Sequence, residues 1–187
     1  WVPTYYHAEN TPQRYDYIAG LPLKWPVAEG RHYSDLGFML LGDIIEQVSG
    51  KRLNIFLQER LYQPLNLNQT YFNPLEKSGG KIAATSHGNP FEKQMIYNDD
   101  FGYNVDVDPE LWDSWRQYTL QGEVNDGNAW YANGGVAGHA GLFSTVDDLQ
   151  VLVDLLLNKG RFGEKQYISS SVIDTFLTKD KYGNGLG

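Results

Sequence analysis

The 187-residue sequence contains no cysteine. It therefore has no disulfide framework, no cysteine-ligated zinc site and no thiol nucleophile. Basic residues are outnumbered, since 15 Lys and Arg stand against 23 Asp and Glu, and the formal net charge is −8 at pH 7. Nucleic acid and anionic membrane surfaces would repel such a chain at long range, so neither is an expected partner.

No apolar run approaches the roughly 20 residues that a membrane-spanning helix needs. The sequence begins at Trp1 instead of Met and ends in the glycine-rich residues 182–187. We therefore expect both ends to be internal positions of a longer protein, and any signal peptide or membrane anchor to belong to segments outside this chain. The sequence is otherwise globular in composition, because 41% of its residues are hydrophobic and hydrophobic runs recur throughout.

Apolar residues recur at helical spacing in several separate segments. They predict helices over residues 11–19, 36–48, 53–61, 144–156 and 170–178. The helix over 36–48 is expected to be largely buried and to end at Ser49-Gly50, because glycine readily adopts the left-handed conformation of a helix end. Residues 66–138 show neither helical nor strand periodicity, which predicts long ordered loops with short helices and little strand. Loops of this length often form a binding surface.

Tyr33-Ser34-Asp35 places a phenol and a carboxylate two residues apart, directly before the helix over 36–48. In an extended backbone both side chains point to the same side. A phenol beside a cation can ionise below its ordinary pKa of about 10 and relay a proton for a serine nucleophile. The same triplet is also typical of an ordinary helix N-cap, and the triplet alone does not decide between the two interpretations.

The residues around this triplet form part of a longer pattern. The segment EGRHYSDLGFMLLG (29–42), the segments 44–50 and 64–74, and the glycine-rich segment GGVAGHAGLFSTVDDL (134–149) follow in this order. Together they resemble the serine β-lactamase-related family, and within it the DD-carboxypeptidase-like proteins of the penicillin-binding-protein 4B type. The resemblance implies the α+β β-lactamase/DD-peptidase fold. Residues 1–187 would be the central part of a single domain, mainly its α-helical lobe with long loops.

The resemblance also implies a catalytic site of three parts: a serine and lysine in S-x-x-K, a tyrosine in Y-x-N, and a K-T-G or H-x-G strand. Tyr33 and Asp35 match the second part, with Asp35 where the family commonly has Asn. The first and third parts are expected outside this chain. Residues 78–81 spell S-x-x-K, but they follow the tyrosine and contain two glycines that oppose a helix, which favours a surface turn. Residues 131–133 spell Y-x-N without a helix directly behind them, and we treat this match as coincidence.

His139 lies among four glycines in the glycine-rich segment. One interpretation is that it lines the cleft and binds substrate, and the alternative is that it makes a hydrogen bond that stabilises the loop. The four histidines show no metal-ligand spacing, and the aspartates between 99 and 108 lack the spacing of a calcium loop. We therefore expect no metal and no cofactor.

The activity implied by the resemblance is that of a serine hydrolase that forms an acyl-serine intermediate. Its substrates would be D-Ala-D-Ala peptides of peptidoglycan or small esters and amides, with β-lactams as further acylating ligands. Such chemistry belongs to the periplasm or the cell exterior, with inner-membrane anchoring only through an N-terminal segment outside this chain. The alternative is a non-catalytic module of the same fold, whose aromatic loops bind peptidoglycan or a protein partner.

Overall fold

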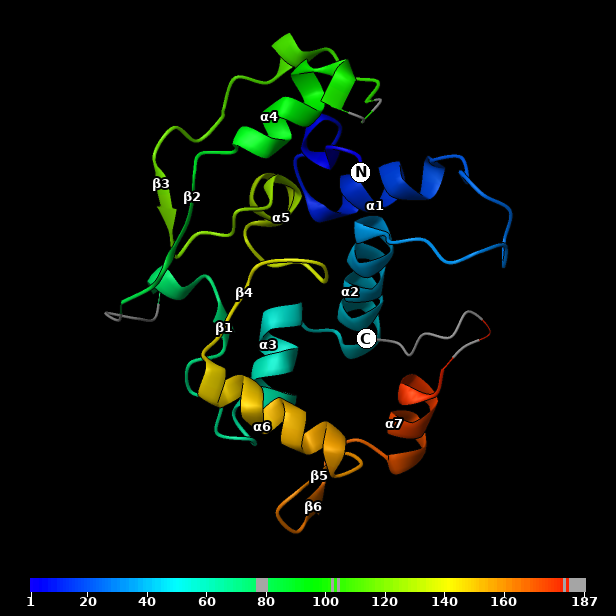
Figure 1. Cartoon of the computed structure of the whole chain (residues 1–187), viewed down its shortest axis with the longest axis vertical. Helices are drawn as coiled ribbons and strands as arrows, with labels where there is room; N and C mark the ends of the chain where they lie inside the picture. Colours follow the sequence, from blue (N-terminus) through cyan, green and yellow to red (C-terminus); the bar gives the residue numbers. More distant parts are fainter. Residues whose placement is uncertain (77–80, 102, 104, 180, 182–187) are drawn as a thin grey trace. The chain divides into compact units, whose positions relative to one another are not determined.

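The computed structural model describes residues 1–76, 81–101, 103, 105–179 and 181 (Figure 1). Its helices are α1 (Thr11–Gly20), α2 (Asp35–Ser49), α3 (Leu53–Leu57), α4 (Pro90–Tyr97), α5 (Gly127–Asn133), α6 (Val146–Leu157) and α7 (Ser170–Leu177). Its strands are β1 (Tyr71–Phe72), β2 (Ala84–His87), β3 (Thr119–Gln121), β4 (Leu142–Phe143), β5 (Arg161–Phe162) and β6 (Lys165–Gln166). None of the helices in the described ranges combines the length and apolar character needed to cross a membrane.

The strands are short and form antiparallel pairs. β1 pairs with β4, β2 with β3 and β5 with β6. In the first pair Tyr71 lies opposite Phe143, so the pair joins positions that are 72 residues apart in the sequence. The low strand content expected from the sequence is confirmed.

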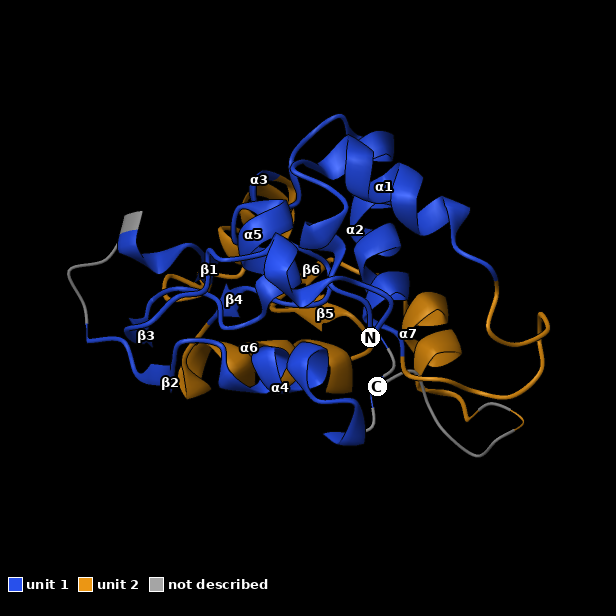
Figure 2. Cartoon of the chain, turned by 90° about the horizontal axis from the view of Figure 1, so that it is seen from above, with its two compact units in different colours: residues 1–22, 34–55, 71–143 blue, residues 23–33, 56–70, 144–187 orange. Residues whose placement is uncertain are grey.

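The chain divides into two compact units (Figure 2). The first unit consists of residues 1–22, 34–55 and 71–143, and the second of residues 23–33, 56–70 and 144–187. The segments of the two units alternate along the chain, so no single cut in the sequence separates them. This alternation explains why composition shows no linker or boundary between the units.

The first unit has an aromatic core. Tyr5, Ile96, Trp115 and Ala132 form one buried cluster, against which Trp112 and Tyr131 pack. Buried hydrogen bonds fasten the N-terminal segment to α5, because the side-chain oxygen of Asn128 accepts from both the backbone N–H of Thr4 (2.7 Å) and its hydroxyl (2.8 Å). Contacts between aromatic side chains, and not only contacts between helices and strands, thus stabilise much of this unit.

Helix α2 begins and ends where local sequence signals predict. The side chain of Ser34 accepts a hydrogen bond from the backbone N–H of Gly37, and Gly50 closes the helix in the left-handed conformation at φ 66°. The expectation that this helix is largely buried is wrong. Only the face with Met39, Gly42 and Asp43 is covered, whereas four apolar side chains elsewhere on the helix are exposed: Phe38, Leu41, Ile44 and Val48. The physical reason is that the apolar stripe is wider than the face that meets other parts of the first unit.

The second unit has an aliphatic core around α6. Tyr62, Leu65, Leu67 and Leu155 form its buried cluster. The carboxylate of Asp148 accepts hydrogen bonds from the N–H of Gln69 and the hydroxyl of Thr70, both at 2.8 Å, and so fixes residues 66–70 to the first turn of α6. The predicted helices over 144–156 and 170–178 are confirmed as α6 and α7. The predicted helix over 53–61 is α3 followed by a π-helical turn at Gln58–Tyr62.

Candidate active site

The Tyr33-Ser34-Asp35 triplet lies at the start of α2. Ser34 has the extended backbone that its capping role requires, with φ −150° and ψ 106°, and Asp35 is the first residue of the helix. A carboxylate in this position is stabilised by the positive end of the helix dipole. Tyr33 is 88% exposed.

Helix α2 and the glycine-rich segment pack through their backbones. A Cβ atom on Gly138 would lie 2.1 Å from the carbonyl oxygen of Phe38, and one on Gly42 would lie 3.2 Å from the backbone nitrogen of Gly138. Only glycine fits at position 138 without a shift of one backbone. Gly42 and Gly138, which come from two of the segments that carry the family resemblance, are therefore in direct contact within the first unit.

A buried ion pair fixes α2 to α1. The guanidinium of Arg14 donates to the carboxylate of Asp43 over 2.6 Å, and the two side chains are only 2% and 9% exposed. Removal of one partner from a buried pair leaves an uncompensated charge and is strongly destabilising. Asp43 lies two turns beyond Asp35, so this pair and the Gly138 contact together hold the helix that begins at Asp35.

His139 is hydrogen-bonded to Asp126 and has little access to solvent. Its Nε2 atom lies 2.8 Å from the Oδ1 atom of Asp126, and its side chain is 3% exposed. The same Asp126 oxygen accepts from the backbone N–H of Ala129 and so caps α5. The Nδ1 atom of His139 is buried and has no hydrogen-bond partner among the described residues. The contact with Asp126 is of the kind expected under the loop-stabilising interpretation.

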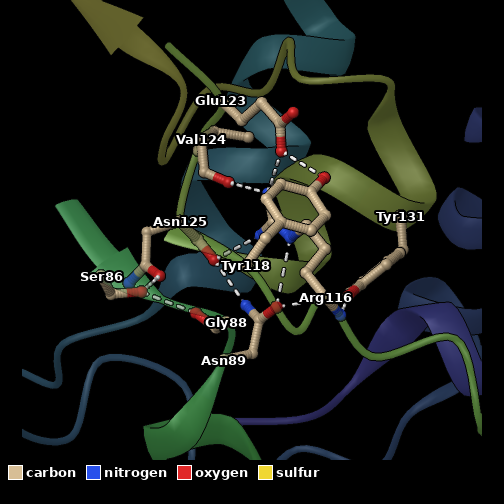
Figure 3. A network of polar contacts seen from close by, with 9 residues as sticks. All are labelled: Ser86, Gly88, Asn89, Arg116, Tyr118, Glu123, Val124, Asn125 and Tyr131. Atoms are coloured by element: carbon tan, nitrogen blue, oxygen red, sulfur yellow. Dashed lines mark hydrogen bonds and ion pairs between the residues drawn. The ribbon is translucent and has the colours of Figure 1, made fainter. Parts of the chain in front are cut away.

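A second polar centre forms around Arg116 (Figure 3). Its guanidinium donates to the carbonyls of Val124 (2.8 Å) and Asn125 (2.9 Å) and to the side-chain oxygen of Asn89 (3.2 Å), and it also pairs with Glu123 at 3.5 Å. The residue is only 6% exposed. Arg116 thus joins the residue before α4 to the segment before α5, within the first unit.

Asp35 and His139 belong to the first unit and Tyr33 to the second. Ser78 lies outside the described residues. Tyr131 packs against the aromatic core. Its hydroxyl accepts from the backbone N–H of Arg116 and donates to the side-chain oxygen of Asn89 (both 3.2 Å). The residues that sequence reasoning missed are Asp126, Arg14 and Arg116. In the described ranges, no three His, Asp or Glu side chains are grouped so that they would hold a metal ion.

The chain is similar in sequence to proteins named as hydrolases. The chain is 36% identical over 174 residues to a Bacillus subtilis (strain 168) protein named N-acetylmuramyl-L-alanine amidase, covering 91% of this chain and 36% of that protein. It is 34% identical over 175 residues to an Escherichia coli (strain K12) protein provisionally named D-alanyl-D-alanine carboxypeptidase, covering 94% of this chain and 38% of that protein. The chain thus spans little more than a third of the length of these relatives.

The fold is similar to that of solved penicillin-binding proteins. An octameric penicillin-binding protein homologue from Pyrococcus abyssi superposes with a TM-score of 0.58 at 20% identity, covering 100% of this chain and 35% of that one. The predicted α+β fold of β-lactamases and DD-peptidases is therefore confirmed. The family model described as Beta-lactamase matches residues 1–184, and the chain belongs to that family.

Proposed function

We propose that this chain is the central part of a serine hydrolase that forms an acyl-serine intermediate. The observation that carries the proposal is the exposed Tyr33 immediately ahead of the capped helix α2, in a chain of the β-lactamase family. The names of the relatives, an amidase and a carboxypeptidase, support hydrolysis of an amide bond. The substrates we propose are D-Ala-D-Ala peptides of peptidoglycan or small esters and amides, with β-lactams as acylating ligands.

In the proposed mechanism Tyr33 relays the proton of the nucleophilic serine. Tyrosine is a weak acid, so this role requires a neighbouring cation that favours the phenolate, which would be the lysine of S-x-x-K. Asp35 can accept a hydrogen bond from that lysine or from an N–H of the substrate, but a carboxylate cannot donate one to a carbonyl. Backbone N–H groups would stabilise the oxyanion of the tetrahedral intermediate, and water would then release the acyl group.

For His139 we propose a role in substrate binding through the loop that it stabilises. Its bond to Asp126 ties the segment after Gly138 to the N-terminus of α5. The segment packs against α2 at Gly138 and Gly42, so its backbone is held close to the helix that follows Tyr33. His139 would therefore position the loop, without contact between its own ring and the substrate.

We further propose that the protein works in the periplasm or outside the cell. The names of both relatives describe reactions on cell-wall components, which are found there. The net charge of −8 favours a small uncharged or cationic partner over nucleic acid. The competing proposal is a non-catalytic module of the same fold that binds peptidoglycan or a protein.

Covalent trapping separates the two proposals. The full-length product of the gene would be incubated with a fluorescent penicillin, and the labelled peptide identified by mass spectrometry. We expect one labelled serine, in an S-x-x-K sequence outside these residues, and no label on the 187-residue chain alone. A label on the chain alone would contradict the assignment and direct attention to Ser78. A full-length product that takes no label and hydrolyses neither peptide nor ester would favour the binding module.

A further inference from the structure

A hollow of about 270 Å³ opens on the first unit, and none of its lining residues is among those assigned to catalysis. Its lining residues are Asn73, Leu75, Gly122, Glu123, Trp130 and Gly134. The volume lies just below the range of typical small-molecule sites, which suits a ligand of about one ring. The walls combine an indole, an isobutyl group, a carboxylate and an amide, so they offer both an apolar surface and hydrogen-bonding groups.

The carboxylate in this hollow is held firmly by one of its two oxygens. Oε2 of Glu123 accepts from the hydroxyl of Tyr118 at 2.8 Å and pairs with the guanidinium of Arg116 at 3.5 Å. The hydrogen bond to Glu123 raises the pKa of Tyr118, so this tyrosine remains a neutral donor. Oε1 makes no hydrogen bond to any described residue, and Figure 3 shows it turned away from Arg116 and Tyr118. It is a fixed acceptor for a ligand.

The indole and the amide are also fixed. Trp130 is half-buried, and the guanidinium carbon of Arg116 lies 4.8 Å from the centre of its ring. The side-chain NH₂ of Asn73 donates to the carbonyl of Gly134 at 3.0 Å, which orients the amide across the rim of the hollow. Its Oδ1 atom would lie 2.0 Å from a Cβ on Gly135, so glycine at position 135 makes room for the amide. The amide of Asn73 is therefore held in one orientation in the wall of the hollow.

These features favour a neutral ligand with several hydroxyl groups. A cation on the face of Trp130 would be repelled by Arg116, whose guanidinium already lies over that ring. An anion would meet the carboxylate of Glu123 at close range. A purely apolar ligand would strip water from the oxygens of Glu123 and Asn73 without replacing its hydrogen bonds, which is costly.

We propose that this hollow binds one neutral saccharide ring. The C–H face of the ring would pack on Trp130 and Leu75, and its hydroxyls would donate to Oε1 of Glu123 and Oδ1 of Asn73. This site does not depend on the proposed hydrolase, because it needs neither the serine nor Tyr33. The ring can belong to a free sugar or to the end of a glycan strand, and both present the same chemistry.

The test is an NMR titration of the 187-residue chain with N-acetylglucosamine, glucose and the β-1,4-linked tetramer of N-acetylglucosamine. The readout is the indole N–H signal of Trp130, which is assigned by its loss in Trp130→Phe. We expect a saturable shift with at least one saccharide and none with butylammonium, the cationic probe of similar size. Tighter binding of the tetramer would identify a glycan strand as the ligand, and equal binding a free sugar.

Two variants test the proposed contacts. Glu123→Gln keeps the shape but removes the charge of the acceptor, and should weaken saccharide binding about ten-fold, as expected for a hydrogen bond to a charged group. Asn73→Gly should weaken saccharide binding too, because it removes the amide oxygen that accepts from the ligand. The backbone should tolerate this change, because Asn73 has φ 49°, a conformation that glycine adopts without strain. The matched control is Glu110→Gln, an exposed carboxylate elsewhere in the first unit, which should change nothing.

The proposal is overturned if no saccharide shifts the Trp130 signal, if butylammonium alone shifts it, or if both variants bind as tightly as the parent chain. Circular dichroism checks the fold of each variant. If Glu123→Gln fails to fold, Asn73→Gly decides the outcome. Hydrolase activity is not part of the readout, so failure here leaves the proposed function intact, and failure of the penicillin experiment leaves this site intact.

Discussion

Two parts of the first unit acquire their order by different means. Where α2 meets the glycine-rich segment, backbone packs against backbone at Gly42 and Gly138. Around Arg116, one buried side chain satisfies acceptors from two separate stretches of the chain, at Asn89 and at Val124-Asn125. The first kind of contact requires glycine at particular positions and is therefore visible as a sequence pattern. The contacts of Arg116 depend on the charge of its side chain and leave no recognisable pattern in the sequence. The two regions should therefore respond differently to mutation and to pH.

The largest expected effect comes from Arg116→Met in the polar centre. The substitution removes the donor of the buried Val124 carbonyl and the ion partner of Glu123. It also takes away one of two donors from the carbonyl of Asn125, which keeps the NH₂ of Asn89, and from the amide oxygen of Asn89, which keeps the hydroxyl of Tyr131. We expect the free energy of unfolding to fall by about 3–5 kcal/mol. Urea denaturation followed by tryptophan fluorescence measures this loss.

Arg161→Met is the matched control for that prediction. Arg161 is exposed on β5, so its replacement should change the free energy of unfolding by no more than about 0.5 kcal/mol. Similar losses in the two variants would show that the charge of the guanidinium matters in general and that the buried network does not.

The pH dependence of stability should also originate near this polar centre. Burial raises the pKa of Glu92 to about 7, although hydrogen bonds from the N–H of Gly127 (2.5 Å) and the hydroxyl of Tyr5 (3.3 Å) oppose the rise. The folded state then binds this proton more tightly than the unfolded state. The contribution of Glu92 to stability is therefore complete below pH of about 4.5 and is lost as the pH rises to about 7.

We expect Glu92 alone to account for a loss of about 3 kcal/mol between these pH values. Glu92→Gln should remove this part of the pH dependence, and Glu110→Gln, which changes an exposed carboxylate, should retain it. Denaturation curves at intervals from pH 4 to pH 8 provide the measurement. An unchanged slope in Glu92→Gln would mean that another group titrates.

The backbone contact should give a smaller loss that is independent of pH. Gly138→Ala places a Cβ 2.1 Å from the carbonyl oxygen of Phe38, and we expect a cost of about 1–3 kcal/mol as α2 or the loop shifts. Gly20→Ala at the end of α1 is the control, because a Cβ there meets nothing within 4 Å. It should leave stability unchanged or raise it by up to about 1 kcal/mol. Equal effects of the two substitutions would refute the close approach.

The smallest expected effect concerns the chemistry of Asp35. In the full-length gene product, Asp35→Asn supplies an NH₂ donor for a substrate carbonyl and removes a negative charge that would keep the catalytic lysine protonated. We expect acylation by a chromogenic β-lactam to become about ten-fold faster, as expected from one hydrogen bond of about 1.4 kcal/mol. Stopped-flow measurement at several pH values tests this, and an unchanged or slower rate would show that the carboxylate is needed as an acceptor.

Helices with local signals could be predicted from the sequence. The hydroxyl of Ser34 and the left-handed Gly50 delimit α2, and Thr145 caps α6, so each boundary depends on neighbouring residues alone. α4 and α5 could not be placed within residues 66–138, because they have eight and seven residues and lie among loops rich in glycine, asparagine and aromatic residues. α7 is as short as α4, but its apolar residues Val172, Ile173, Phe176 and Leu177 recur at helical spacing. The strand pairs escaped detection for a different reason. They have two to four residues each, and β1 and β2 find partners far along the chain, whereas β5 and β6 form a local pair of only two residues each.

The candidate site was predicted unevenly for similar reasons. Tyr33 and Asp35 were found through a short motif, and Gly138 through a run of glycines. Arg116 was missed because a single arginine between aromatic residues has no characteristic spacing. The partner of His139 was not predicted either, since Asp126 lies 13 residues away and only the folded loop brings the two together.

The most direct test of the account is the catalytic role of Tyr33. In the full-length gene product, Tyr33→Phe retains the ring and should leave the fold intact, while kcat for a D-Ala-D-Ala peptide or an ester should fall by roughly 10²- to 10⁴-fold. Tyr15→Phe on α1 is the matched control and should retain the parent rate. If Tyr33→Phe hydrolyses both substrates at the rate of the parent enzyme, the phenol takes no part in proton transfer, and the assignment of the site to the start of α2 is contradicted.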